Sequence, residues 1–194
     1  MSSNNLTQDF YGNAIISVSN GQIIAKVEDI LIDPATLQVA ALVTARRGGG
    51  LLQREQEVDL ILGDKVQVWG QDAVLVSEAD VVVPENETPG SEKWLSVSEQ
   101  LKGRDVISID GRRIGQLNDV ALDVKGKVVE YALAQVAIEG PIAQSKRIAT
   151  ETTYALGQDV LLVKIEEIVE TVEAEATPPA EPDANSEEGY IIEE

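Results

Sequence analysis

The chain has 194 residues, a formal net charge of −19 and 43% hydrophobic residues, while aromatic residues make up only 4%. Cys and His are both absent, which excludes disulfides, thiolate metal sites and thiol catalysis and removes the commonest general base. The apolar content comes mainly from Val, Ile, Leu and Ala, and because β-branched side chains favour the pleated surface of a sheet, we expect β structure.

The charge is unevenly distributed along the chain. From residue 166 onward there are eleven acids and no Lys or Arg; removing these from the 34 acids of the whole chain leaves 23 acids against 15 bases, a net charge of −8. Clustered Lys and Arg bind phosphate backbones, and the densest basic spots here are only Arg46-Arg47 and Arg112-Arg113. Direct binding of nucleic acid is therefore disfavoured.

The amino-terminal residues contain no basic region followed by an apolar segment, so they do not resemble a secretory signal. The longest unbroken apolar run, residues 39–43, is far shorter than the ~20 residues that span a bilayer. We therefore expect a cytoplasmic protein without a transmembrane segment, which reaches a membrane only through a partner.

Residues 6–83 form the first predicted domain, a run of short strands. Asn20-Gly21 stands between apolar runs and predicts a hairpin in which both turn positions have positive φ. The apolar residues that follow, at spacings of three, three and two, indicate a strand with a bulge, with a short helix as the alternative; they are Ile24, Val27, Ile30 and Ile32. The phrase GQDAVLV at residues 70–76 predicts a buried closing strand.

Residues 84–93 combine Pro, Gly, Glu and Asn, which is the composition of a linker. Residues 94–165 then repeat the pattern of the first domain. Residues 103–123 align with residues 12–33 with one gap, and GQDVLLV at residues 157–163 repeats the closing phrase. The two phrases follow their hairpin glycines at similar intervals, 49 residues after Gly21 and 46 after Gly111. This agreement indicates a duplicated domain, and we expect two small β-barrels, each with its own core and no open edges.

Residues 166–194 form an acidic tail. Apolar residues at helical spacing, from Ile165 to Val172, indicate a short helix at its start, and the Pro- and Glu-rich remainder predicts disorder. Near its end, Tyr190, Ile191 and Ile192 form an apolar triplet that a disordered tail does not need. A docking peptide and a chance apolar remnant account for it equally well.

The aligned segments resemble the PRC-barrel family, which includes the cytoplasmic domain of the H subunit of photosynthetic reaction centres and the carboxy-terminal domain of ribosome-maturation factors. The likeness rests on LKGRDVISIDGRRIGQLNDVALD with GQDVLLV, and on YGNAIISVSNGQIIAKVEDILID with GQDAVLV. Two such domains with an acidic tail are similar to stand-alone proteins of cyanobacteria. The resemblance implies tandem β-barrels that act as a docking module, without a shared set of catalytic residues. Unlike the H subunit, this chain shows no membrane-spanning helix, and a second barrel-like copy replaces the amino-terminal domain of the ribosome-maturation factors.

Several other residues invite a functional interpretation. The run Arg46-Arg47-Gly48-Gly49-Gly50 suggests phosphate binding but lacks the Gly-Lys-Ser/Thr ending of a P-loop, which favours a loop. The pairs Asp29 with Asp33 and Asp119 with Asp123 suggest a hard-cation site, yet without a surrounding loop of oxygen ligands we expect turn-ending, solvent-facing carboxylates. Ser145-Lys146 places a hydroxyl beside an amine, but adjacency in sequence is not catalytic geometry. Trp69 and Trp94 are expected to pack in the core or between domains.

No residue set predicts a catalytic, metal or cofactor site. We therefore expect a non-enzymatic protein-binding or scaffolding module, linked by the resemblance to the assembly or regulation of a photosynthetic complex. The alternatives are an assembly factor for ribosomes or another ribonucleoprotein that acts through a protein partner, and a small-ligand-binding or enzymatic barrel.

Overall fold

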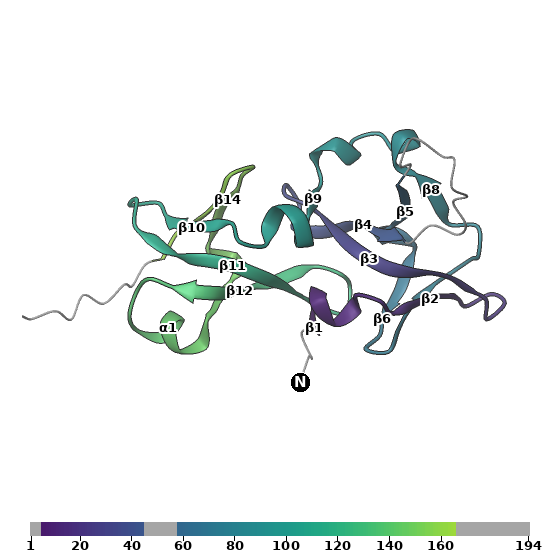
Figure 1. Cartoon of the computed structure of the whole chain (residues 1–194), viewed down its shortest axis with the longest axis horizontal. Coiled ribbons are helices and arrows are strands. Elements are labelled where there is room, and N and C mark those ends of the chain that lie inside the picture. Colours follow the sequence, from purple (N-terminus) through teal and green to yellow (C-terminus); the bar gives the residue numbers. More distant parts are fainter. Residues whose placement is uncertain (1–4, 45–57, 166–194) are drawn as a thin grey trace, which may run out of the picture.

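The computed structural model describes residues 5–44 and 58–165, and the expected all-β fold is confirmed (Figure 1). The first sheet has the order β6-β7-β2-β3-β4-β5-β8, with β9 paired to β3. Its strands are β6 (Val66–Trp69), β7 (Ala73–Val76), β2 (Ala14–Ser17), β3 (Ile23–Asp33), β4 (Gln38–Thr44), β5 (Asp59–Leu62), β8 (Val82–Pro84) and β9 (Leu95–Ser96). We call residues 5–83 the first half and residues 94–165 the second half.

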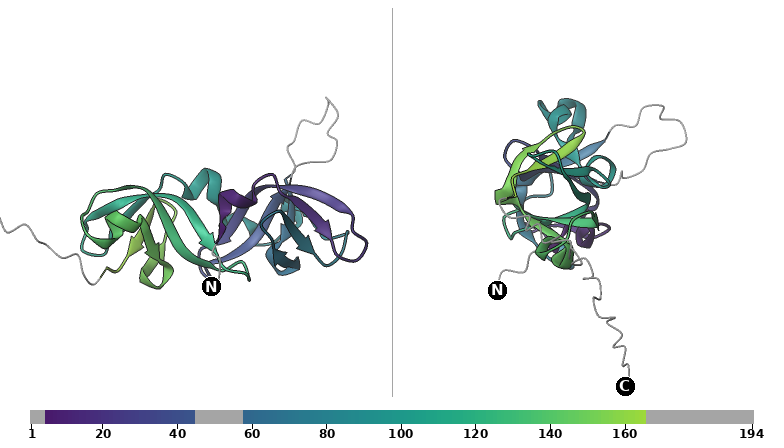
Figure 2. Two further views of the ribbon diagram at one scale, coloured as in Figure 1. Left: turned by 90° about the horizontal axis from the view of Figure 1, so that it is seen from below. Right: turned by 90° about the vertical axis from the view of Figure 1, so that its left-hand side faces the viewer.

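The second sheet has the order β13-β12-β11-β10-β15-β14, with β1 paired to β11. Its strands are β13 (Arg147–Ala149), β12 (Val128–Val136), β11 (Arg113–Leu122), β10 (Asp105–Ser108), β15 (Val160–Val163), β14 (Thr153–Leu156) and β1 (Asn5–Leu6). Six strands that follow one another in each half therefore occupy the same positions in their sheets. Figure 2 shows the two sheets side by side along the long axis of the molecule.

The helical elements are all short. Single turns precede β2 and β10, as η1 (Thr7–Phe10) and η5 (Val97–Leu101), and precede β6 and β14, as η2 (Gly63–Lys65) and η6 (Thr150–Thr152). The remaining helix of the second half is α1 (Pro141–Ser145), and the predicted linker at residues 84–93 contains η3 (Glu85–Glu87) and η4 (Ser91–Lys93). Among the described residues, none of the helices is long and apolar enough to cross a membrane.

The repeated closing phrase forms the strands β7 and β15, which pair in parallel with β2 and β10. Val74 pairs with Ile15 and Leu161 with Val106, and all four side chains are buried. Burial therefore explains why the residues of these two strands are apolar. The Gly-Gln-Asp letters form the turn that leads into each strand.

The strands β3 and β11 are bulged, and the helix considered for residues 27–32 is wrong. The register with the neighbouring strand shifts between Val27 and Asp29, and again between Leu117 and Asp119. An extra residue in one strand changes the face to which the following side chains point. Val27 and Ile30 thus both join the main core, while Asp29 turns to the other side of β3.

The hairpin turns differ from the sequence prediction in one respect. Gly21 and Gly111 have positive φ, at +70° and +86°, but Asn20 and Asp110 do not. The loops are longer than two residues, because the flanking backbone pairs are Ser17 with Gln22 and Ser108 with Arg112. In such loops only the last position needs the left-handed conformation. The first loop is one residue longer than the second, which accounts for the single gap between the two segments.

The expectation of a separate core for each copy is wrong. One cluster of buried hydrophobic residues runs through both halves and includes Phe10, Ile30 and Trp69 from the first and Leu117 and Tyr131 from the second. A smaller cluster of Leu31, Ala41 and Leu60 lies on the other side of the first sheet. The domain limits at residues 83, 93 and 165 stay predictions. The tail with Tyr190, Ile191 and Ile192, the helix expected at its start, and the loop at residues 46–50 lie outside the described residues.

Candidate functional site

The junction between the two halves is built by an exchange of short arms. The amino-terminal arm (residues 5–10, β1 and η1) pairs with the second half, Asn5 opposite Leu122 and Leu6 opposite Ala121. The middle arm (residues 95–101, β9 and η5) pairs with the first half, Leu31 opposite Ser96 and Ile32 opposite Leu95. Figure 1 shows both arms near the centre of the molecule, with β9 and its helical turn above the long strands β3 and β11, and β1 and its helical turn below them. Each half thus contributes a strand and a helical turn to the other.

The amino-terminal arm is held by Asp119, which follows the bulge of β11 and is only 3% exposed. Its carboxylate accepts a hydrogen bond from the Thr7 hydroxyl. It also accepts from the backbone N–H of Gln8 at 3.1 Å and of Val120 at 2.7 Å. A buried carboxylate requires such donors because removing its charge from water is costly. Asp119 is therefore a structural anchor for this arm.

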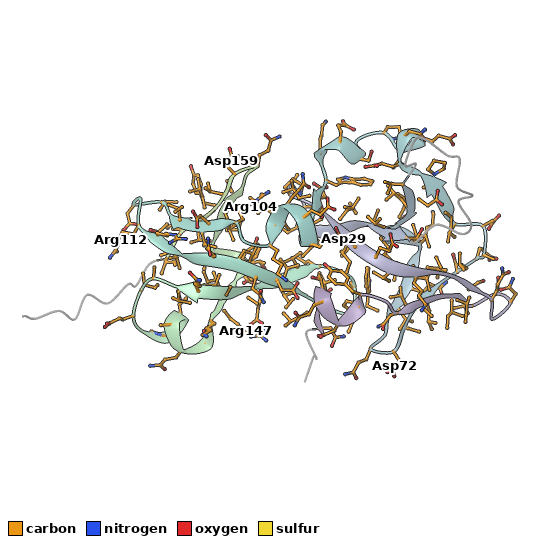
Figure 3. All side chains as sticks on the ribbon, viewed as in Figure 1. Asp29, Asp72, Arg104, Arg112, Arg147 and Asp159 are labelled. Carbon is orange, nitrogen blue, oxygen red and sulfur yellow. The ribbon has the colours of Figure 1, made fainter. Side chains whose placement is uncertain are left out.

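The middle arm is held in the same way by Asp29, which follows the bulge of β3 and is 8% exposed (Figure 3). Its carboxylate accepts from the Ser96 hydroxyl, from the Ser98 N–H at 3.2 Å and from the Ile30 N–H at 2.8 Å. The Tyr11 hydroxyl donates to it at 3.2 Å. Burial of the phenol, with the nearby carboxylates of Asp29 and Asp119 adding to the effect, raises the pKa of Tyr11.

The sequence interpretation of these acids was half right. Asp33 and Asp123 do end turns: Asp33 accepts from the Ala35 N–H at 2.9 Å, and Asp123 accepts from the Lys125 N–H at 2.8 Å. Asp29 and Asp119 are not solvent-facing, because the bulge turns each of them towards an arm of the other half. No group of three or more potential metal ligands lies together within residues 5–44 and 58–165.

Asn13 and Arg104 each connect one arm to a closing turn, which is the turn that leads into β7 or β15. Asn13 donates its side-chain N–H to the Asp9 carbonyl at 3.2 Å and to the Gln71 carbonyl at 2.9 Å. Arg104 donates to the Gln100 carbonyl at 3.1 Å and to the Gly157 carbonyl.

These two residues occupy corresponding places, each directly after an aligned glycine, and sequence reasoning missed them because Asn and Arg share no chemical pattern. Burial lowers the pKa of Arg104, and the Asp159 carboxylate opposes this. Figure 3 shows Asp72 and Asp159, from the two closing turns, at opposite edges of the molecule.

Two hairpin turns also meet at the junction. Val39 N–H donates to the Gly126 carbonyl, and Val128 N–H donates to the Leu37 carbonyl, each at 2.9 Å. Trp69 packs against Gly126, and its ring lies edge-on to Phe10 with centroids 5.5 Å apart. Trp69 is 7% exposed and belongs to the main core, so its predicted packing role is confirmed.

A groove lies beside the middle arm, with a cavity volume of about 450 Å³. Four of its lining residues are apolar, namely Leu31, Val43, Val58 and Trp94. Its remaining lining residues are polar and acidic, and include Glu28, Asp29, Glu85, Glu92 and Glu99. Lys and Arg are absent from its described lining. The arrangement suits a ligand that combines apolar and cationic groups.

Trp94 has two roles in this groove. Trp94 packs against the small cluster of Leu31, Ala41 and Leu60, and its half-buried side chain also lines the groove. The expected packing role is therefore correct but incomplete. The sequence did not indicate the groove, because its lining residues are far apart in the chain: they come from β3, β4, Val58 before β5, the predicted linker, Trp94 and the middle arm.

Ser145 and Lys146 do not form a nucleophile and base. The Ser145 hydroxyl accepts from the Arg147 N–H at 3.2 Å, at the end of α1. Lys146 adopts a left-handed conformation that terminates this helix. Both side chains are exposed. The pair is a local turn.

Comparison with known proteins bears on the second half. No curated protein matches the chain. A protein-family model matches one segment that makes up somewhat over a third of the chain. This segment includes most of the middle-arm turn, Arg104, the bulged strand β11 and the closing strand β15. Residues 98–169 match the PRC-barrel domain.

Proposed function

We propose that this chain is a non-enzymatic protein-binding or scaffolding module. The observation that carries the proposal is the groove beside the middle arm, whose lining combines the apolar residues Leu31, Val43, Val58 and Trp94 with several acids. A half-buried aromatic side chain beside aliphatic residues supplies the kind of anchor pocket found in protein interfaces. The partner that fits best is a segment that inserts an apolar side chain and carries Lys or Arg beside it.

The match of residues 98–169 to the PRC-barrel domain supports the same class of function, because the resemblance implies a docking module. We extend this to residues 6–83 as a second barrel-like domain joined through residues 84–93, supported by the shared strand order. A link to the assembly or regulation of a photosynthetic complex, and a cytoplasmic place at the surface of its membrane, rest on the family resemblance alone.

The groove can be tested with a charge-matched pair of variants. Glu85→Gln, Glu92→Gln and Glu99→Gln remove three charges from the groove walls. The control variant removes three charges from exposed acids that do not line the groove, at Glu78, Glu139 and Glu151. Partner recovery after affinity purification of the tagged full-length protein from its native host should fall in the groove variant only. Equal recovery in both variants would refute the groove as the binding site.

The identity of the recovered proteins separates the candidate functions. Photosystem or antenna proteins favour the photosynthetic role, whereas ribosomal proteins favour an assembly factor that acts through a protein partner. A small-ligand-binding or enzymatic barrel would instead show a bound compound in a native mass spectrum or a ligand-dependent shift in melting temperature.

A further inference from the structure

An apolar row crosses the outer face of the first sheet. The strand registers place Val68 beside Leu75, Leu75 beside Ile16, and Ile16 beside Ile23, across β6, β7, β2 and β3. Val68 and Ile23 remain 46% and 54% exposed, and the two central side chains are half-buried. A continuous apolar strip across four strands is unusual for a solvated sheet face, because such faces are normally polar.

The fold itself does not require this row. The corresponding positions in the second half are Ala155, Leu162, Ile107 and Arg113, in the same registers across β14, β15, β10 and β11. The two central positions stay aliphatic there, but the ends are a small residue and an ion-paired Arg that contacts Asp105. The same topology is therefore compatible with a small residue at one end and a charged residue at the other, so the fold does not account for the larger apolar ends of the first row.

We propose that this apolar row binds the Tyr190–Ile191–Ile192 segment of the chain's own tail. In an extended segment Tyr190 and Ile192 point to the same side, so these two side chains can lie on the half-buried central pair of the row, Ile16 and Leu75. Lys26 lies in the neighbouring row, opposite Ala14, and its exposed ammonium can pair with Glu193 or Glu194, which follow the triplet. The nearby Glu28 lines the groove and does not belong to the row.

The tail is long enough to reach this face. Tyr190 lies 25 residues beyond Ile165, the last residue that the structure describes. A chain of that length spans roughly 80 Å when extended. Ile165 ends the second half and the row lies in the first, so this reach has to cover the distance between the two halves along the long axis of the molecule (Figure 2). The tether also keeps the segment in the neighbourhood of the row, so a contact too weak to form between separate molecules can form within one chain.

The test uses the full-length protein with a photo-reactive benzoylphenylalanine at Val68. Irradiation should give a cross-link within one chain, at monomer mass, to the peptide that contains Tyr190 to Ile192. The cross-link should be lost when Tyr190, Ile191 and Ile192 are changed to Ser. Placing the probe at Val124, which is 67% exposed but not in the row, is the matched control and should give no cross-link to the tail.

Three other outcomes overturn the proposal. A product at dimer mass means that a second copy covers the row, a cross-link to a different protein means an external partner, and a cross-link to another part of the tail excludes the triplet. A second variant, Ile23→Arg, copies the charge found at Arg113 and should weaken the cross-link at Val68.

Methyl NMR of the full chain gives an independent measurement without the probe. The Tyr190, Ile191 and Ile192 to Ser variant should shift the signals of Ile16 and Leu75, and unchanged signals contradict the proposal. The outcome does not depend on the groove, so this proposal and the proposed function can fail separately.

Discussion

Gly126 offers a direct test of how the two halves are joined. It has φ of +75° in the turn between β11 and β12, and a Cβ added there would lie 2.9 Å from Cε2 and Nε1 of Trp69. The left-handed conformation costs a non-glycine residue about 1–2 kcal/mol, and overpacking adds about 1–3 kcal/mol. Gly126→Ala should therefore lower the free energy of unfolding by about 2–5 kcal/mol.

Gly111→Ala is the matched control. Gly111 has φ of +86°, but no heavy atom lies within 4 Å of its added Cβ, so only the backbone cost of about 1–2 kcal/mol applies. The difference between the two variants isolates the contact of Trp69 with the other half. Urea unfolding should be followed by circular dichroism and by Trp69 fluorescence, in a Trp94→Phe background that leaves one Trp.

The two signals should change in one transition, because Trp69 belongs to a core shared by both halves. Equal costs for the two glycine substitutions would refute the reasoning. So would a fluorescence transition separate from the loss of circular dichroism, since it would mean that the halves unfold independently. A smaller cost of Gly126→Ala in a Trp69→Leu background would locate the effect in this contact.

Three further predictions concern the arms and the buried phenol. Cleavage at a protease site inserted in residues 84–93 should leave two fragments that co-elute and separate only in denaturant, because the arms are exchanged; separate elution of two folded fragments would contradict this. Thr7→Val should lower the free energy of unfolding by about 1.5–3 kcal/mol, since it removes a buried hydrogen bond to a carboxylate, whereas Thr36→Val, at an exposed bond to Asp33, should change it by under ~0.5 kcal/mol. Because burial raises the pKa of Tyr11 above the value of about 10 for an unfolded phenol, the folded state keeps a proton that the unfolded state loses, and stability falls as pH rises above about 10. Tyr11→Phe should make this alkaline fall shallower in urea unfolding measured at several pH values, and an unchanged slope would exclude the phenol as its source.

The sequence alone determined the local structure of each half. Glycines at Gly21 and Gly111, and apolar residues spaced three, three and two apart, are local patterns, because turn geometry and a bulge depend on neighbouring residues. The bulged strands, the turns and the buried closing strands were accordingly predicted. The same patterns predicted two-residue hairpin loops, whereas the loops have four residues in the first half and three in the second. Asn-Gly and Asp-Gly also occur in these longer loops.

The tertiary structure alone decided how the halves combine. An arm such as residues 5–10 can in principle pair with the bulged strand of its own half or with that of the other, and two similar strands make these choices indistinguishable in sequence. Long-range contacts decide between them: the buried carboxylates of Asp29 and Asp119 each accept a hydrogen bond from a hydroxyl of the other half. The groove has the same origin, since its walls come from segments far apart in the chain that only the exchanged middle arm brings together.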